Sequence, residues 1–301
     1  MRSFKIKEQY NNKDITYVLK KEFPRLSNSS LNKVFRVKDV KVNGIRVAKD
    51  YLVTPGEEVQ VYLTDNILFG MDTNIFYAYE DENILVAYKP KGVVSTLGKD
   101  KREVSKVYFD EIVKKEKPGS IICHRLDTNT EGLVVFAKTK EAHKELLEAF
   151  KNSNIHKEYL TLVYGKPPKD SAKLSHYIAE ANGYSKVLTK NAPGSKSCIT
   201  EYSLVEYNKM LNASILSVKL YTGRTHQIRA HMKFLDCPVI GDSKYSTNEI
   251  NAKFKLYTQV LYASKYTFSL PKDSPLYYLN NITIDIKDDI LDKIHELLKN
   301  K

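Results

Sequence analysis

The sequence of 301 residues contains few cysteines and no long apolar run. No stretch of eighteen apolar residues occurs, so we expect no membrane-spanning helix. The N-terminal segment lacks the apolar core of a signal peptide, which predicts a cytoplasmic protein. The three cysteines, Cys123, Cys198 and Cys237, are odd in number and widely spaced, which argues against a disulfide framework and a Cys-x-x-Cys metal pair. We therefore expect reduced, inert thiols.

Positive charge is in excess. The chain has 48 Lys and Arg against 36 Asp and Glu, a formal net charge of +12. A basic balance at this size favours a polyanionic partner, either nucleic acid or a membrane surface, although Lys-rich composition alone also explains it. The hydrophobic fraction of 42% is ordinary for a soluble globular protein, and the length suits one large domain with a small one.

The first sixty-odd residues predict a small α+β domain. Apolar residues after Asp14 recur at spacings of three and four until Pro24, which is typical of a helix, and a second short helix follows over 31–35. Asn43 and Gly44 join two strand-like segments and predict a hairpin, because both residues tolerate positive φ. A further strand is expected over 58–62.

This order of helix, helix, hairpin and strand resembles the small RNA-binding domain named after ribosomal protein S-four. Between residues 31 and 49 the segment carries one acid, Asp39, and six basic residues: Lys33, Arg36, Lys38, Lys41, Arg46 and Lys49. Such a cluster can neutralise several phosphates. We therefore expect a small basic RNA-binding domain over 12–66, with a solvated face that binds nothing as the alternative.

A second segment, 123–138, combines polar and apolar residues. The apolar run 133–137 is bounded by Gly132 and Lys138 and predicts a buried strand. Asp127 therefore lies on a loop anchored by apolar segments, where its carboxylate must be paired or hydrogen-bonded. A lone Asp in a turn is usually structural. Arg125 and a basic motif a hundred residues later favour a functional carboxylate here.

That later motif, TGRTHQIRAHMKFLDCPVIGD, occupies 222–242. It predicts a helix capped by Thr225, whose N-terminus, flanked by Arg224 and Arg229, is a natural anion site. His226 and His231 are five residues apart and lack the Glu of the zinc-protease pattern, so we expect no metal there.

Four segments resemble one family. HRLDTNTEGL resembles the active-site motif of the large-subunit ribosomal type of RNA pseudouridine synthase, with Glu131 where a small residue is commoner. KPKG at 89–92 resembles that family's first motif, with Thr96 in place of its usual His. HKEYLTLVYG at 156–165 resembles its tyrosine-bearing strand, and 222–242 resembles its last motif.

The resemblance implies an isomerase that breaks the nitrogen–carbon glycosidic bond of uridine and rejoins the ring through carbon. It implies Asp127 as catalytic carboxylate, Arg229 as its partner and Tyr159 as a stacking face for the flipped base. Because the reaction imports no group and oxidises nothing, we expect neither cofactor nor metal. RNA or target-base contacts are assigned to four further residues: His124, Arg125, Arg224 and Ile228.

We therefore expect an α+β protein, with a mixed, mostly antiparallel-sheet catalytic domain over 75–301 after the small domain. Structured RNA is the expected partner, ribosomal RNA ahead of transfer RNA, and the protein is expected to act as a monomer. The alternative is a non-catalytic RNA-binding assembly factor on the same scaffold; the presence of Asp127, Tyr159 and Arg229 favours the enzyme. Helices are expected over 104–115, 140–151 and 288–298, and strands over 75–79, 84–88, 172–178, 198–207 and 214–220.

Overall fold

The computed structural model describes residues 2–24, 26, 28–36, 39–62, 75–96 and 108–299. The chain folds as two compact units, residues 1–75 with 97–112 and residues 76–96 with 113–301. The polar segment 64–74 and residues 104–107 of a predicted helix lie outside the described residues. No helix in the described part of the chain is long and apolar enough to span a membrane.

The first unit contains a small antiparallel sheet and two helices. Its elements are β1 (Arg2–Lys5), η1 (Glu8–Tyr10), α1 (Ile15–Glu22), α2 (Asn28–Arg36), β2 (Val40–Val42), β3 (Ile45–Arg46) and β4 (Glu58–Val61), with sheet order β1-β4-β2-β3. The Asp14 carboxylate caps α1 by accepting a hydrogen bond from the Tyr17 amide at 2.8 Å. Asn43 and Gly44 both have positive φ, so the predicted hairpin is confirmed.

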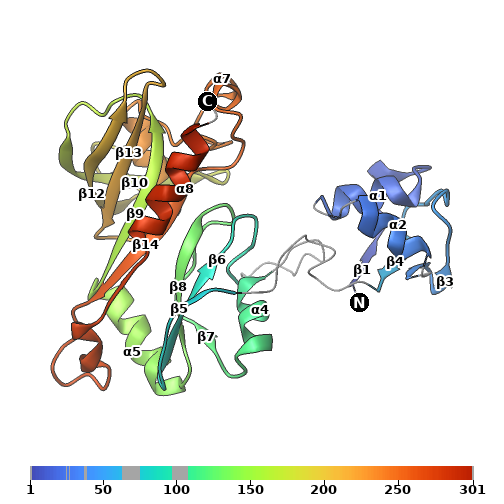
Figure 1. The fold of residues 1–301 in the computed structure, drawn as a ribbon, viewed down its shortest axis with the longest axis horizontal. Coiled ribbons are helices and arrows are strands. Elements are labelled where there is room, and N and C mark those ends of the chain that lie inside the picture. Colours follow the sequence, from blue (N-terminus) through green and yellow to red (C-terminus); the bar gives the residue numbers. More distant parts are fainter. Residues whose placement is uncertain are drawn as a thin grey trace. The chain divides into compact units, whose positions relative to one another are not determined.

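The second unit is organised by one sheet of eleven strands (Figure 1). From residue 76 onward the elements are β5 (Tyr77–Glu80), β6 (Ile84–Lys89), α4 (Phe109–Glu116), β7 (Ile121–Ile122), β8 (Glu131–Ala137), α5 (Lys140–Lys151), β9 (Ile155–Tyr164), β10 (Ser171–Ala181), β11 (Tyr184–Leu188), β12 (Lys196–Asn208), β13 (Ala213–Leu220), α6 (Gln227–Phe234), α7 (Asn248–Lys253), β14 (Leu261–Phe268), η2 (Tyr277–Asn281), β15 (Thr283–Asp285) and α8 (Lys287–Lys299). The expected mixed, mostly antiparallel α+β fold is confirmed.

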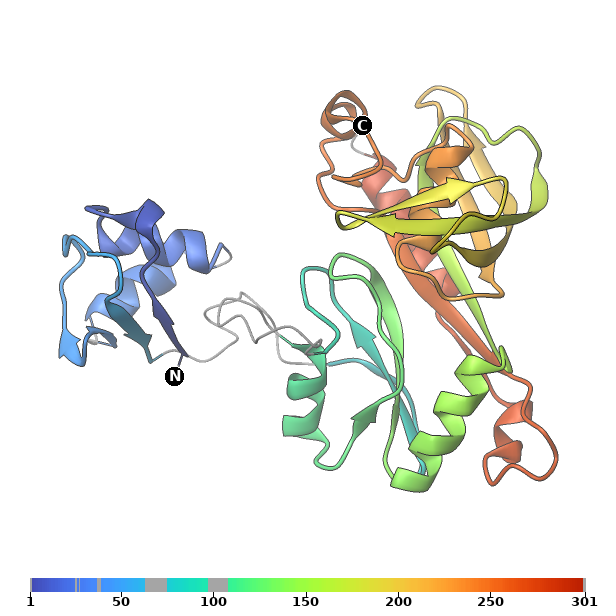
Figure 2. The ribbon, with the colours of Figure 1, turned by 180° about the vertical axis from the view of Figure 1, so that it is seen from behind.

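The strand order is β11-β10-β12-β13-β9-β14-β8-β6-β5, with β15 on β14 and β7 on β8. β14 therefore joins two parts of the sheet that the chain builds separately. It pairs antiparallel with β9 and, over Tyr262 and Ala263, parallel with Glu131 and Gly132 of β8. Figures 1 and 2 show β9 and β14 running together between the two parts, with α8 along them.

Burial explains the apolar run 133–137 within β8. All seven of its residues are buried, which is expected of a central strand covered on both faces. On one side α5 contributes Ala142, Leu146 and Ala149, the stripe that its sequence predicts. The two other predicted helices correspond to α4 and α8, whereas β14 was not predicted from the sequence.

Candidate active site

The loop that carries Asp127 is held by the KPKG segment. Lys89 is fully buried, and its ammonium donates hydrogen bonds to the carbonyls of Pro90, Val93 and Thr128 at 3.0, 2.8 and 3.0 Å. Because the three carbonyls come from both segments, this charge fastens the Asp127 loop to the end of β6.

Ser95 makes a second connection between these segments. Its hydroxyl donates to the Leu126 carbonyl at 2.8 Å and accepts from the Leu126 amide at 2.9 Å. Sequence reasoning overlooked Ser95, although it precedes the Thr96 that replaces the family's usual His. The backbone immediately before Asp127 is therefore fixed on both its polar groups.

On its other side the loop runs into β8 at a point of close backbone approach. Gly132 has φ +113°, and a Cβ there would lie 2.2 Å from the Ala263 carbonyl oxygen of β14. Only glycine fits this crossing. Two residues before Gly132, the Thr130 hydroxyl accepts a hydrogen bond from the Gln259 side-chain amide at 2.8 Å.

Asp127 is paired with Arg229, as the sequence predicts. Arg229 Nη1 donates to Asp127 Oδ2 at 2.8 Å, and the rest of the guanidinium binds Asp242 in two-pronged fashion, Nε to Oδ2 at 2.6 Å and Nη2 to Oδ1 at 2.9 Å. Asp242 is fully buried, while Asp127 keeps 29% of its side chain exposed. Burial alone would lower the pKa of Arg229, but Asp242 and Asp127 raise it.

His226 also faces this carboxylate, with Nε2 3.9 Å from Asp127 Oδ2. Its backbone is left-handed, with φ 52° and ψ 21°, a conformation that few non-glycine residues adopt. Burial lowers the pKa of His226, with the Asp127 charge acting in the opposite direction, so the ring is neutral at pH 7.

Hydrogen bonds behind the ring assign its tautomer. The Ser185 amide donates to the Tyr245 hydroxyl oxygen at 2.7 Å, and that hydroxyl lies 3.0 Å from His226 Nδ1. Since the Tyr245 oxygen accepts from the amide, its own proton is available to Nδ1. This arrangement favours the neutral tautomer that carries its proton on Nε2, the ring nitrogen that faces Asp127.

This geometry corrects one prediction. Thr225 does not cap α6, which begins at Gln227 with His226 in the N-cap position and no side-chain cap. The Gln227 side chain reaches back instead, accepting from the Thr222 hydroxyl at 2.8 Å and the Arg224 amide at 3.0 Å. These two hydrogen bonds close the turn before α6, and the His226 ring lies beside Asp127.

Tyr159 lies in the middle of β9, between Val218 of β13 and Ala263 of β14. Its side chain is 7% exposed and borders the same pocket as Asp127. Burial, and to a lesser degree the Asp127 charge, raise the pKa of the Tyr159 hydroxyl, so it remains protonated.

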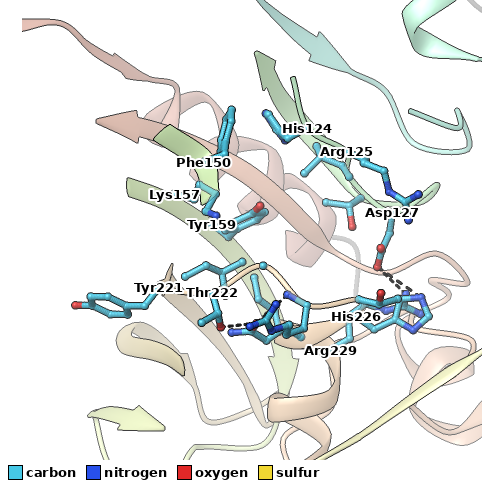
Figure 3. A pocket seen from close by; sticks show the side chains of 18 of the residues that line it. His124, Arg125, Asp127, Phe150, Lys157, Tyr159, Tyr221, Thr222, His226 and Arg229 are labelled. Atoms are coloured by element: carbon cyan, nitrogen blue, oxygen red, sulfur yellow. Dashed lines mark hydrogen bonds and ion pairs between the residues drawn. The ribbon is translucent and has the colours of Figure 1, made fainter. Parts of the chain in front are cut away.

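These residues surround a pocket of about 540 Å³ (Figure 3). Volumes of this order suit small ligands or a single extruded nucleotide. The predicted residues that the pocket brings together are His124, Arg125, Asp127, Tyr159, Arg224, Ile228 and Arg229.

The polar residues at its edge differ in how they are held. His124 Nε2 accepts from the Val135 amide at 3.1 Å, and its ring lies 4.6 Å from that of Phe150. Burial lowers the pKa of His124 to about 3. Arg125 is exposed, and Arg224 uses Nε to bind the Ser197 carbonyl at 2.9 Å.

The basic residues predicted for RNA contact near the N-terminus belong to the first unit. Arg36 and Arg46 are exposed, and Lys41 lies directly opposite Arg46 in the hairpin, with its ammonium 5.0 Å from the centre of the Tyr62 ring. Lys33 lies in α2, and Lys38 lies outside the described residues.

The structure also bears on thiol chemistry and on metal binding. Burial raises the pKa of the Cys123 thiol to about 12 and of Cys237 to about 11, so neither is a thiolate at neutral pH. Within the described part of the chain, no three His, Cys, Asp or Glu side chains are arranged to hold a metal ion.

Comparisons with known proteins show which family this chain resembles. The family model described as RNA pseudouridylate synthase matches residues 83–234. The ribosomal large subunit pseudouridine synthase D of Buchnera aphidicola subsp. Schizaphis graminum is 30% identical over 302 residues, 94% of this chain and 94% of its own. The ribosomal large subunit pseudouridine synthase C of Rickettsia bellii is 30% identical over 251 residues, 77% of this chain and 82% of its own. The solved structure of human RNA Pseudouridylate Synthase Domain Containing 1 has a similar fold, with a TM-score of 0.56 at 22% identity over 71% of this chain and 82% of that one.

Proposed function

Because this chain belongs to the RNA pseudouridylate synthase family and is an isomerase acting on RNA, we propose that it converts defined uridines of large-subunit ribosomal RNA to pseudouridine, with Asp127 as the catalytic carboxylate. One observation carries the assignment of Asp127. It is the sole carboxylate among the described residues that line the pocket, and Arg229 pairs with it across 102 positions of sequence.

The reaction defines what the carboxylate must do. The bond from uracil N1 to C1′ of the ribose breaks, the ring rotates, and a bond from C5 to C1′ forms. N1 ends with a proton, and C5 loses its proton to solvent. An ionised carboxylate beside the ribose serves either as nucleophile at C1′ or as base on the sugar.

Within the described part of the chain, the side-chain contacts of Asp127 leave one carboxylate oxygen, Oδ1, for that task. Oδ2 accepts from Arg229 and faces the His226 Nε2 proton, and neither residue bonds Oδ1. We assign Oδ1 to the substrate. Arg229 keeps the carboxylate charged in a partly enclosed site, and Asp242 holds the guanidinium in the plane that this contact requires.

The apolar wall of the pocket suits the base. A uridine stacked in RNA is out of reach of the carboxylate, so it must be flipped out of its stack. Tyr159 and Ile228, both nearly buried, provide flat and apolar surfaces for the extruded ring. We assign Arg125 and Arg224, at the pocket edge, to contacts with the RNA backbone. The His124 ring accepts a hydrogen bond from the Val135 amide, so we assign His124 to supporting the pocket wall.

The basic residues of the first unit add an electrostatic contribution to RNA binding. Arg36, Lys41 and Arg46 lie on its helix α2 and its hairpin, and we assign them, with Lys33 and Lys38, to phosphate contacts that strengthen binding without reading sequence.

Tritium release tests the function. A transcript of bacterial large-subunit ribosomal RNA, labelled with tritium at uridine C5, should lose label to water in the presence of the protein, because C5 gives up its proton in the reaction. Mapping pseudouridines in RNA from cells with and without the gene then identifies the position. An unchanged map of ribosomal RNA together with lost sites in transfer RNA would reject the proposed substrate.

A further inference from the structure

Lys157 is a cation of the pocket that no part of the proposed reaction uses. It lies on β9 two residues before Tyr159, so both side chains project from the same face of the strand. Figure 3 shows the two side chains next to each other on the pocket wall. The Lys157 side chain is partly buried, and that burial lowers the pKa of its ammonium.

No acid of the pocket is available to neutralise this ammonium. Lys157 makes no ion pair or hydrogen bond with any described residue. Its neighbour Glu158 projects from the opposite face of β9, where it pairs with Lys287 and Lys265. The single carboxylate of the pocket, Asp127, is already bonded to Arg229.

The space in front of the ammonium is open. Lys157 Nζ would lie 3.7 Å from a Cβ at Gly223, so a side chain at that position would border the ammonium directly. Behind it, Nζ lies 5.8 Å from the centre of the Phe150 ring, an aromatic contact that brings no negative charge to the ammonium. A partly desolvated charge without a partner is unfavourable unless a ligand supplies the opposite charge.

We propose that Lys157 binds a backbone phosphate of the RNA strand that enters the pocket, next to the flipped uridine. This inference rests on the proposed function and adds a second subsite to it. The end of the pocket with Asp127 holds the nucleoside, and the end with Lys157, Phe150 and Gly223 holds the adjoining phosphate. The phosphate therefore fixes how far the strand inserts.

The first test is equilibrium binding of a full-length Lys157→Met variant. The probe is an unmodified transcript of bacterial large-subunit ribosomal RNA, and Asp127→Asn is present in every protein so that no turnover occurs. Lys157→Met should weaken binding about tenfold, and the slope of log K against log salt concentration should become shallower by about one, because one phosphate contact is lost. Lys157→Arg should keep the wild-type slope.

Lys151→Met is the matched control. Lys151 is an exposed lysine at the end of α5 that lines the same pocket. Its loss should change the slope by clearly less than the loss of Lys157. Equal changes in the two variants would mean that the pocket mouth attracts RNA through its general charge, and the proposal would then be wrong. An unchanged slope in Lys157→Met would reject it directly.

Thermal unfolding without RNA gives an independent readout. Lys157→Met should melt at the same temperature as the wild type or higher, because it removes an unpaired charge and keeps the apolar stem. A lower melting temperature would show that the ammonium supports the fold, which contradicts the proposal. Binding and turnover are measured separately. Failure of the wild type to isomerise this transcript would count against the proposed substrate, but the comparison of salt slopes would remain valid.

Discussion

Arg229 bridges two carboxylates that differ in solvent exposure. It donates to the partly exposed Asp127 with Nη1 and to the buried Asp242 with Nε and Nη2. Asp242 Oδ1 also accepts hydrogen bonds from the Lys244 and Tyr245 amides, at 2.8 and 3.1 Å. The guanidinium is therefore fixed from behind and presents one N–H to the pocket. A lysine at this position has no planar fork with which to reach both acids.

Asp127→Asn should abolish isomerisation and leave RNA affinity within a few-fold of the wild type. In the proposed mechanism the carboxylate performs the chemistry, whereas it contributes no attraction to phosphates. Tritium release and filter binding measure the two effects separately. Release near the wild-type rate would remove Asp127 from the mechanism.

Arg229→Ala should lower activity by orders of magnitude and should also destabilise the fold by about 3–5 kcal/mol, since it leaves the fully buried Asp242 without its cation. Chemical denaturation measures the stability, and Arg229→Lys should restore it only in part. Arg224→Ala is the control: it removes one bond to the Ser197 carbonyl and should change RNA affinity more than stability. The reverse pattern would exchange the roles of the two arginines.

Tyr245→Phe should lower kcat by about 10- to 100-fold, although Tyr245 does not line the pocket. The variant loses the hydroxyl that donates to His226 Nδ1, so the ring is free to place its proton on either nitrogen. Nitrogen chemical shifts of His226 report the tautomer. Tyr184→Phe, an exposed ring 6.1 Å from that of Tyr245, is the control and should leave both kcat and the shifts unchanged.

Acid should unfold the protein partly through His231. This side chain is fully buried between Thr200, Cys198 and His176, and burial lowers its pKa to about 4. Between pH 6.5 and about 4 the unfolded chain binds a proton there that the folded chain does not. Stability is therefore complete above pH 6.5 and falls by about 1.4 kcal/mol per pH unit below it.

Denaturation at a series of pH values tests this slope. His231→Gln should make it shallower by the contribution of one proton, and His156→Gln, at an exposed position of β9, should not. Equal slopes in the wild type and His231→Gln would show that the His231 ring does not resist protonation in the fold.

Charge reversal in the first unit should weaken RNA binding without changing chemistry at saturating RNA. Lys41→Glu with Arg46→Glu alters two cations that face each other across the hairpin, and the salt slope should become shallower by about two. Lys20→Glu, exposed on α1 of the same unit, is the control for net charge. Identical slopes in both variants would mean that the hairpin makes no specific phosphate contact.

Local chemistry made part of this molecule predictable from sequence. The helix that follows Asp14, the turn at Asn43 and Gly44 and the apolar stripe of α5 each depend on residues a few positions apart. The pairing of Asp127 with Arg229 was predicted from the motifs and not from such local physics.

Long-range packing decided what was not predicted. Asp242 was recognised only as part of a motif, because its buried contact with Arg229 depends on where α6 is placed. Thr225 has the chemistry of a helix cap, but Gln227 closes that turn from inside the helix. β14 escaped prediction because its alternation is interrupted by a bulge between Ala263 and Lys265, and because β8 and β9, the two strands between which it pairs, lie about a hundred residues or more earlier in the chain.

The position of β14 also has a consequence for the timing of biosynthesis. Residues 124–229 contain the carboxylate, the tyrosine and the arginine, yet in the sheet β8 and β9 are joined through β14, which lies between them and begins at Leu261. A nascent chain that ends before this strand has two separate half-sheets, and Tyr159 lacks its neighbour Ala263. We expect such a chain to be inactive. On a ribosome, where RNA of the proposed substrate class surrounds the emerging polypeptide, the protein would acquire activity only when its synthesis is nearly complete.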